Sequence, residues 1–352
     1  MPFRLFPVSR SQFPALALAL ILALAVTLLL AVTIGPVRIA PGLVWRVVLH
    51  EIGLRPSVDW EPFQQTIIWE IRVPRVLLGG LVGAGLAVAG TTLQALVRNP
   101  LADPYLLGVS AGASLGAVAT LVLGVTWLAG LSRSAAGFLG ALLALATVLA
   151  MARRGGRLTA GRLILAGVAV AYVFSALTSA LIYASPNGEA AKGVLYWLLG
   201  GLGGARWTQL GWPAVILVGT TAWLLTQARS LNAVSVGEET AATLGVDTAR
   251  FRWTLFALTS LLTGALVAVS GGIGFVGLML PHIVRVFVGA DHRRLLPVAA
   301  LVGAIFLIWV DVLARTIIAP AELPIGIITA LLGAPFFLWV MGTGSREVGK
   351  GF

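Results

Sequence analysis

Long apolar runs recur along this chain and limit what it can fold into. A run of about twenty apolar residues can cross a bilayer as an α-helix, and a backbone inside a bilayer bonds itself only in helices or closed barrels. Only 11% of the residues are charged, against about 25% in soluble domains. We therefore predict an all-α integral membrane protein, a single transmembrane domain over 1–352. Ten helices are expected, over 14–34, 74–97, 105–128, 134–152, 162–184, 210–227, 253–270, 275–290, 296–315 and 325–342.

The first apolar run is expected to remain in the protein as a transmembrane helix. It is longer than the apolar region of a signal peptide, and no small-x-small cleavage site follows it. Each half of the chain would hold five helices, an odd number. The two halves would therefore have opposite topology, as in transporters built from inverted repeats.

Charge sidedness orients the helices. An even number of helices puts both chain ends on one side. If that side is cytoplasmic, the cytoplasmic segments hold 15 of the 24 Lys and Arg residues but only 6 of the 13 Asp and Glu residues. This asymmetry satisfies the positive-inside rule, so both termini are predicted to be cytoplasmic. The net charge of +11 then reflects sidedness, and no nucleic-acid partner is expected.

A polar corner lies between the second and third expected helices. Proline cannot continue a helix and biases the preceding residue away from the helical region, so one helix should end near Arg98 and the next begin near Pro104. Glycines at 108, 112 and 116 follow at a spacing of four, which would leave a groove of bare backbone for close helix packing. Structural roles are predicted for Asn99, Pro100, Asp103, Pro104, Gly108 and Gly112.

A polar insert over 236–250 is predicted on the cytoplasmic side. Glu238 and Glu239 suit the start of a short helix, and Gly245 suits its end. Membrane packing alone gives such an insert little reason to exist. The insert is therefore interpreted as a docking surface.

Enzymatic function is not indicated. The chain has no cysteine. The GxGxxG match at 272–277 lies between apolar helices rather than in a βαβ unit, and the GxxxxGK match at 344–350 lacks the Ser or Thr and the strand of a P-loop. The three histidines lack carboxylates at ligand spacing, so no metal site is predicted. No cofactor is expected in this chain.

Intramembrane charge is sparse. Only Asp311 and Arg315 qualify as ionisable groups inside the membrane, and they are four residues apart, where they can pair with each other. A secondary carrier coupled to ions or protons usually needs ionisable groups near the midplane. Such a carrier remains the alternative, but the uncharged core favours a transporter whose energy comes from another subunit.

Several motifs together resemble one family, the permease subunits of type II ABC importers for iron–siderophore complexes, haem or cobalamin, a FecCD-like family that includes the vitamin B12 permeases. The matching segments are Arg72 to Arg75, Gly85 to Gly90 with Gln94, Arg98 to Pro104 with Leu107 to Ala113, Leu165 to Val168, Trp197 with Gly200 and Gly201, Gly272 to Leu278 with Pro281 to Arg285, Asp291 to Arg293, Asp311 with Arg315, and Glu322 to Gly326 with Gly333 to Phe337.

The resemblance implies partners and a location. A second copy of the chain, two cytoplasmic ATPase subunits that hold ATP and Mg²⁺, and an external or periplasmic substrate-binding protein would assemble in the bacterial cytoplasmic (inner) membrane. The cargo would be an iron chelate (siderophore or haem) or cobalamin, with a molybdate-type oxyanion as the alternative cargo.

The resemblance also implies roles for individual residues. Those expected to couple to the ATPase are Glu238, Glu239, Ala242, Leu244 and Gly245. Those expected to dock the binding protein are Arg72, Arg75 and Arg315. The fifth helix would line the pathway with Ala169, Tyr172, Ser175, Ala176 and Ser179, and the cytoplasmic gate would comprise Leu158, Thr159, Ala160 and Gly161.

Overall fold

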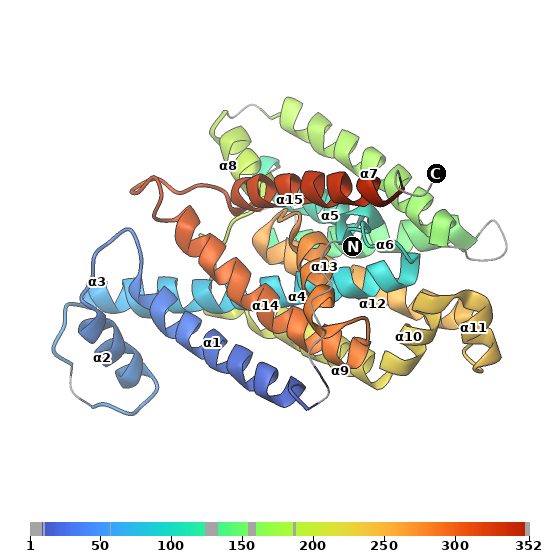
Figure 1. The fold of residues 1–352 in the computed structure, drawn as a ribbon. Helices are drawn as coiled ribbons and strands as arrows, with labels where there is room; N and C mark the ends of the chain where they lie inside the picture. The colour runs from blue at the N-terminus through green and yellow to red at the C-terminus, as the bar shows by residue number, and fades with distance from the viewer. Residues whose placement is uncertain are drawn as a thin grey trace.

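The structure is a computed structural model that describes residues 9, 11–56, 58–123, 133–153, 160–185 and 188–348. Every regular element in these ranges is helical (Figure 1). The elements are α1 (Phe13–Thr33), α2 (Pro41–Glu51), α3 (Pro62–Gln65), the π-helical η1 (Thr66–Arg72), α4 (Val73–Val97), the 3₁₀ turn η2 (Pro104–Leu107), α5 (Val109–Val122), α6 (Arg133–Arg153), α7 (Ala160–Tyr183), α8 (Gly188–Leu198), the 3₁₀ turn η4 (Trp207–Gln209), α9 (Gly211–Thr226), α10 (Ala228–Val236), α11 (Glu238–Thr243), α12 (Thr248–Ser270), α13 (Val276–Val288), α14 (His292–Ala314) and α15 (Ile325–Val348).

Each of the ten predicted segments contains a helix, and the all-α prediction is confirmed. Seven helices in the described ranges are long and apolar enough to cross a membrane, while α5, α13 and the apolar part Ile325–Val340 of α15 are shorter. The count of ten spanning helices therefore stays a prediction. α12 begins five residues before its predicted start because the Asp247 side chain accepts a bond from Arg250 N at 3.0 Å and caps the helix there.

α4 is the central helix. It packs against α14, α12 and α13, and 83% of the most apolar window of its span is buried. Only 17% of the corresponding windows of α1 and α9 is buried, so these helices lie at the periphery (Figure 1). Because lipid replaces water around the bundle, packing of small residues is what brings such helices together.

Backbone contacts between helices pass through glycines. A Cβ at Gly83 of α4 would lie 2.1 Å from Gly303 O of α14, and a Cβ at Gly303 would lie 2.4 Å from Gly83 O. The predicted groove is confirmed at Gly112, where a Cβ would lie 2.3 Å from Gly140 O of α6. Gly108 is different: it has φ +75° and separates η2 from α5, so its prediction as a helical residue is wrong.

The polar corner folds as predicted. α4 ends at Val97, Arg98 caps it with φ +55°, and η2 begins at Pro104. Asn99 Oδ1 accepts a bond from Leu101 N at 2.9 Å, and Asp103 Oδ1 accepts one from Tyr105 N at 2.8 Å. Asn99 and Asp103 therefore shape the turn.

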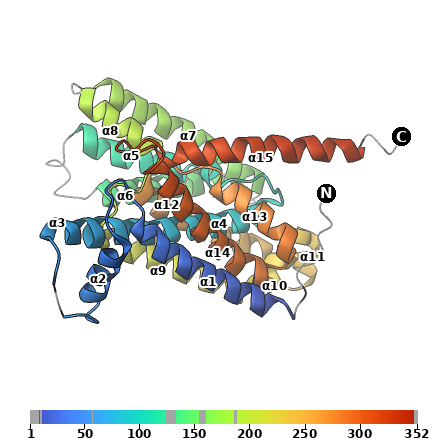
Figure 2. The ribbon, with the colours of Figure 1, turned by 60° about the vertical axis from the view of Figure 1, so that its left-hand side comes forward.

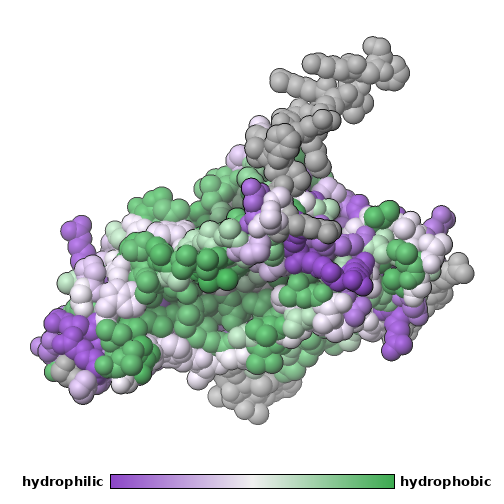
Figure 3. All heavy atoms as spheres, turned by 60° about the horizontal axis from the view of Figure 1, so that its bottom comes forward, coloured by the Kyte–Doolittle hydropathy of each residue, from purple (hydrophilic) through white to green (hydrophobic). Residues whose placement is uncertain are grey.

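The bundle has two polar ends. The α2 end carries α2, α3 and α8, and the α11 end carries α10 and α11 (Figure 2). Hydrophobic residues cover most of the middle of the face in Figure 3, while hydrophilic residues gather at its left end and over its right-hand third. The Arg294 guanidinium lies 5.7 Å from the Phe13 ring, so α1 starts beside the start of α14, and α15 runs toward the same α11 end (Figure 2).

Candidate functional site

A buried ionic cluster of Arg75, Asp311, Arg315 and Glu322 lies at the α2 end. Arg75 Nε donates to Asp311 Oδ1 at 2.9 Å and to Oδ2 at 3.1 Å, and its Nη2 lies 2.9 Å from Oδ1. Arg75 Nη1 donates to Glu322 Oε1 at 2.8 Å. Arg315 Nε lies 3.4 Å from Asp311 Oδ2, which confirms that this pair of residues in one helix interacts. The four formal charges cancel within the cluster.

Two arginines also complete the end of α1. The last carbonyls of a helix have no partner within the helix and carry partial negative charge. Arg72 Nη1 donates to Val32 O at 3.3 Å and to Thr33 O at 3.1 Å, and Arg315 Nη2 donates to Ala31 O at 3.0 Å. Arg72 Nη2 additionally donates to the Val37 carbonyl. These contacts hold α1 against α4 and α14.

This placement disagrees with the docking role predicted for Arg72, Arg75 and Arg315. Their exposed fractions are 3%, 5% and 1%, and carbonyls or carboxylates of the same chain already occupy their guanidinium groups. In this conformation none of the three reaches a protein that docks from outside. Asp311, at 1% exposure, is likewise a core residue rather than a surface one. Arg72 and Arg315 become internal because they bind the end of α1, and Arg75 becomes internal because it is paired with Asp311 and Glu322.

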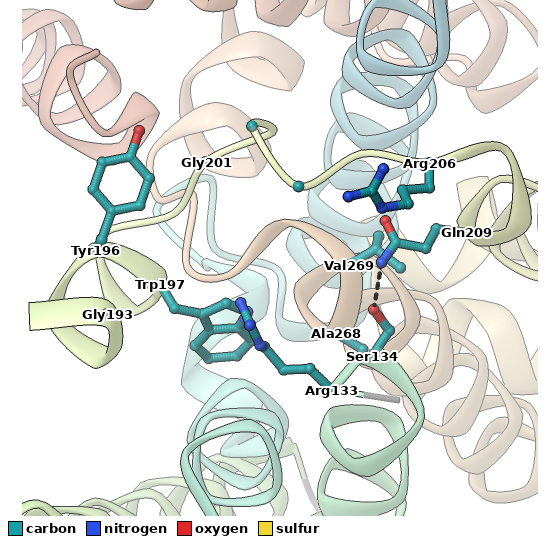
Figure 4. Close-up of a pocket in the computed structure, with 12 residues that line it drawn as sticks. Arg133, Ser134, Gly193, Tyr196, Trp197, Gly201, Arg206, Gln209, Ala268 and Val269 are labelled. Atoms are coloured by element: carbon teal, nitrogen blue, oxygen red, sulfur yellow. Dashed lines mark hydrogen bonds between the residues drawn. The ribbon is translucent and has the colours of Figure 1, made fainter. Parts of the chain in front are cut away.

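A cavity of about 320 Å³ opens next to this cluster (Figure 4). Arg133 at the start of α6 and Arg206 before η4 line it, together with Trp197. Gln209 Nε2 donates to Ser134 Oγ at 3.2 Å across its floor (Figure 4). The cavity therefore presents guanidinium, amide and aromatic groups at the α2 end.

Gly203 lines the cavity and also lies beside the ionic cluster. A Cβ at Gly203 would lie 3.5 Å from Glu322 Oε2. Tyr196 also lines the cavity; burial and then the nearby Glu322 charge raise its pKa, so its hydroxyl stays protonated. The cavity and the cluster are thus one polar region.

Arg133 and Arg206 are functional candidates that the motifs missed. Both side chains are exposed, unlike the three arginines that the motifs indicated. In the sequence, only their position could have indicated them: each stands just before an expected apolar helix that starts at this end of the bundle.

The predicted pathway residues lie together on one face of α7. All five of them are exposed, whereas Val170, Phe174 and Thr178, at the intervening helical positions, are buried. Tyr172 is 73% exposed. α7 and α15 lie on the same side of the bundle (Figures 1 and 2). The face is apolar or weakly polar and carries no charge.

The predicted gate is only partly described. Leu158 and Thr159 lie outside the described residues, and Ala160 and Gly161 are the first residues of α7. A Cβ at Gly161 would have no atom of another segment within 4 Å in the described structure. Among the described residues, none occupies the space beside Gly161.

The predicted coupling insert forms α11 and the start of α12. Glu239, Ala242, Leu244 and Gly245 are exposed, Leu244 to 69%. Gly245 has φ +80° just after α11, as predicted for a helix stop. The Glu238 side chain, which is 44% exposed, contacts Arg252 directly and Arg98 at 3.8 Å. The insert thus presents one exposed carboxylate and one that anchors it to the bundle.

A polar contact joins the neighbouring α10 to α14. Asn232 Nδ2 donates to Asp291 Oδ1 at 2.8 Å, and His292 N donates to Asn232 Oδ1 at 3.0 Å. Burial raises the pKa of Asp291, but the bond from Asn232, the backbone bond from Arg293 and the nearby arginine charges bring it below its ordinary value. Asn232 therefore links α10 to the start of α14.

No group of three or more metal-binding side chains occurs in the part of the chain that the structure describes. At one end, the bundle instead has a neutralised ionic cluster beside a basic cavity. At the other end, it has an exposed short helix.

Known proteins resemble this chain over most of its length. The model of the FecCD transport family matches residues 22–343. A relative from Halobacterium salinarum, "Cobalamin import system permease protein BtuC", is 46% identical over 81% of this chain and 75% of its own length. "Vitamin B12 import system permease protein BtuC" from Salmonella paratyphi A is 43% identical over 82% of this chain and 87% of its own.

A solved structure has the same fold. It is described as a metal-chelate type ABC transporter in an inward-facing conformation, with a TM-score of 0.79 and 34% identity. The alignment covers 94% of this chain and 99% of that chain. The predicted resemblance and the prediction of a transport component rather than an enzyme are confirmed. The chain belongs to the FecCD transport family and is a permease subunit of an ABC importer.

Proposed function

We propose that this permease carries cobalamin inward as a homodimer, driven by ATP hydrolysis in two cytoplasmic ATPase subunits. The observation that supports the cargo is that relatives more than 40% identical over four fifths of the chain are named for cobalamin or vitamin B12 import. Iron chelates are the second candidate cargo, because the similar solved structure is described as a metal-chelate transporter.

The uncharged face of α7 supports the pathway and the dimer. An apolar, weakly polar wall suits a conduit that releases its cargo, since an ionised group there would hold a bound solute. In the homodimer, the exposed faces of α7 from two copies would enclose the pathway, with Ala160 and Gly161 at its cytoplasmic mouth. ATP and Mg²⁺ would bind only in the ATPase subunits.

The proposed orientation puts the α11 end in the cytoplasm and the α2 end outside. The charge asymmetry of the sequence supports it. α11 would then dock the ATPase through Glu239, Ala242 and Leu244, which are exposed. At the α2 end, the exposed Arg133 and Arg206 would receive acidic side chains of the binding protein.

Uptake by proteoliposomes tests the cargo and the energy source. Vesicles containing the permease, its ATPase and its binding protein are expected to transport labelled cobalamin only when ATP is present on the side of the membrane where the ATPase subunits lie. A ferric siderophore and haem, tested in the same vesicles, are expected to give at least tenfold less uptake. Cobalamin uptake driven by an ion gradient without ATP would overturn the mechanism, and preferential siderophore or haem uptake would overturn the cargo.

A charge reversal tests docking at the basic cavity. Arg206→Glu is expected to weaken the affinity of the binding protein at least tenfold, because it places a carboxylate where an acidic partner group would sit. Arg38→Glu is the matched control: Arg38 is exposed at the same end but does not line the cavity. Equal losses for both variants would mean that only net charge matters.

A further inference from the structure

A second cavity, of about 320 Å³, lies at the α11 end. It is formed where α4 ends, α13 ends and α14 begins, with α10 on one side. Four basic side chains line it, Arg98, His282, Arg285 and His292, and none of its lining residues is acidic. The docking of α11 does not account for this concentration of basic groups.

Arg285 contacts a neutral amide. Its Nη2 donates to Gln94 Oε1 at 3.1 Å, and Gln94 Nε2 in turn donates to Leu278 O at 3.1 Å, which fixes the amide with its oxygen toward Arg285. Among the described residues, no carboxylate lies within 4.0 Å of the Arg285 guanidinium. A half-buried cation with only one neutral partner calls for an anion, because buried charge is otherwise costly.

Arg98 is only weakly neutralised. Its nearest carboxylate among the described residues is that of Glu238, at 3.8 Å, and Glu238 is in closer contact with Arg252. Two guanidinium groups, those of Arg98 and Arg285, therefore line the cavity. The carboxylate nearest to Arg98 among the described residues is already bound more closely by Arg252. Guanidinium groups bind tetrahedral oxyanions through paired N–H donors.

His292 lines the cavity in a fixed orientation. Its Nδ1 lies 2.6 Å from Asn232 Oδ1, an oxygen that can only accept, so Nδ1 carries the proton. Its Nε2 is buried and has no hydrogen-bond partner in the described structure. Because Nε2 has almost no accessible surface, it is not offered to a ligand in the cavity, and the case for a ligand rests on Arg98 and Arg285.

The walls define the class of ligand. Ala95, Val286 and Ala290 are apolar lining residues, and the cavity lies where apolar helices end. A basic floor with apolar walls at that depth suits a phosphate group, either on a phospholipid headgroup or free. We propose that this cavity is a phosphate-binding site at the α11 end of the permease.

A simpler role for the two arginines makes a different prediction. Cations at helix C-termini interact favourably with the terminal carbonyls, and Arg98 caps α4 while Arg285 lies in the last turn of α13. In that case the cavity itself would bind nothing. The test therefore measures binding, and it includes a variant that fills the cavity while keeping both arginines.

The experiment uses the full-length chain purified in a phosphate-free detergent. Inorganic phosphate is titrated against chloride at equal ionic strength, with thermal unfolding as the readout, and phosphatidylglycerol or phosphatidylcholine retained by the protein is counted by native mass spectrometry. One saturable site is expected for phosphate, for a phospholipid, or for both in competition. Saturation by phosphate alone identifies a free-phosphate site; retention of a phospholipid that phosphate displaces identifies a headgroup site.

Variants keep the proposal falsifiable. Arg285→Gln is expected to weaken binding at least tenfold, while Arg293→Gln, an exposed arginine outside the cavity, is expected to leave it unchanged. Ala290→Trp changes an exposed lining residue and should block the cavity without disturbing the core, in case Arg285→Gln fails to fold. The proposal is overturned if neither probe saturates, if Ala290→Trp binds normally, or if Arg293→Gln weakens binding as much as Arg285→Gln.

Discussion

Replacing Asp311 by Asn should destabilise this protein through the ionic cluster. The change keeps the size of the side chain and removes one negative charge, so the formal charge of Arg75, Asp311, Arg315 and Glu322 rises from zero to +1. The site is buried: Asp311 and Arg315 are each 1% exposed. An amide oxygen can accept from one arginine, but its NH₂ group would face the second guanidinium as donor against donor.

The magnitude follows from the contacts that are lost. Asp311 receives two bonds from Arg75 Nε, at 2.9 and 3.1 Å, and lies 2.9 Å from its Nη2 and 3.4 Å from Arg315 Nε. Removing one partner of a buried ion pair costs about 3–5 kcal/mol. At the roughly 2 °C per kcal/mol typical of large soluble domains, the unfolding midpoint should fall by about 6–10 °C.

Thermal unfolding in detergent, followed by tryptophan fluorescence, measures this effect; the chain has 11 tryptophans. Glu322→Gln is the matched control. The Glu322 side chain is 26% exposed and accepts one bond from Arg75, so its loss should cost only about 1–2 kcal/mol. Adding Arg315→Met to Asp311→Asn restores a neutral cluster and should recover part of the midpoint. If Asp311→Asn is as stable as Glu322→Gln, the cluster does not stabilise the fold in this way.

Three further predictions concern other parts of the bundle. Gly83→Ala should lower the unfolding midpoint, because its Cβ would lie 2.1 Å from a backbone oxygen of α14. Gly80→Ala should be neutral or slightly stabilising, because its Cβ would lie 3.4 Å from a side-chain atom. Equal midpoints for the two variants would contradict this. Glu239→Lys should leave the fold intact but reduce cargo-stimulated ATP hydrolysis in the assembled transporter, and normal stimulation would argue against α11 as the docking helix. The pKa of Asp291 lies below its ordinary 3.8, so the stabilisation of the fold by the Asp291 carboxylate is complete above pH 3.8 and is lost as the pH falls through the folded pKa. The difference in unfolding midpoint between wild type and Asn232→Ala should therefore shrink in acid. A difference that stays constant with pH would refute this role of Asp291.

Most of the helices could be predicted because the bilayer imposes a length and a composition on each of them. The ends of α1, α6, α7 and α9 fall within two residues of their predicted positions. Helix boundaries set by polar capping were harder, as α12 shows, because an Asp before a polar first turn looks like a loop residue. Gly108 was misassigned because spacing alone does not reveal a positive φ.

The ionic cluster could be predicted only in part. Asp311 and Arg315 are four residues apart on one helix, so their pairing follows from local geometry. Arg75 and Asp311 are 236 residues apart, and nothing local to either one indicates the contact. Burial of Arg72 and Arg315 depends on where α1 ends, which is a property of the assembled bundle.

The contacts of α4 and α14 indicate which parts of the permease can move. The two helices touch backbone to backbone at Gly83 and Gly303, and the ionic cluster joins them again at the α2 end. At the α11 end, Asn232 links α10 to α14, and Glu238 contacts Arg98 at the end of α4. A displacement of α11 therefore reaches both helices of a rigid pair, and we infer that they move as one body while α7 and α15, whose outer faces are uncovered, change position. Spin labels on α4 and α14 should keep their distance through the ATP cycle while labels on α7 and α4 separate; a change between α4 and α14 would contradict the rigid pair.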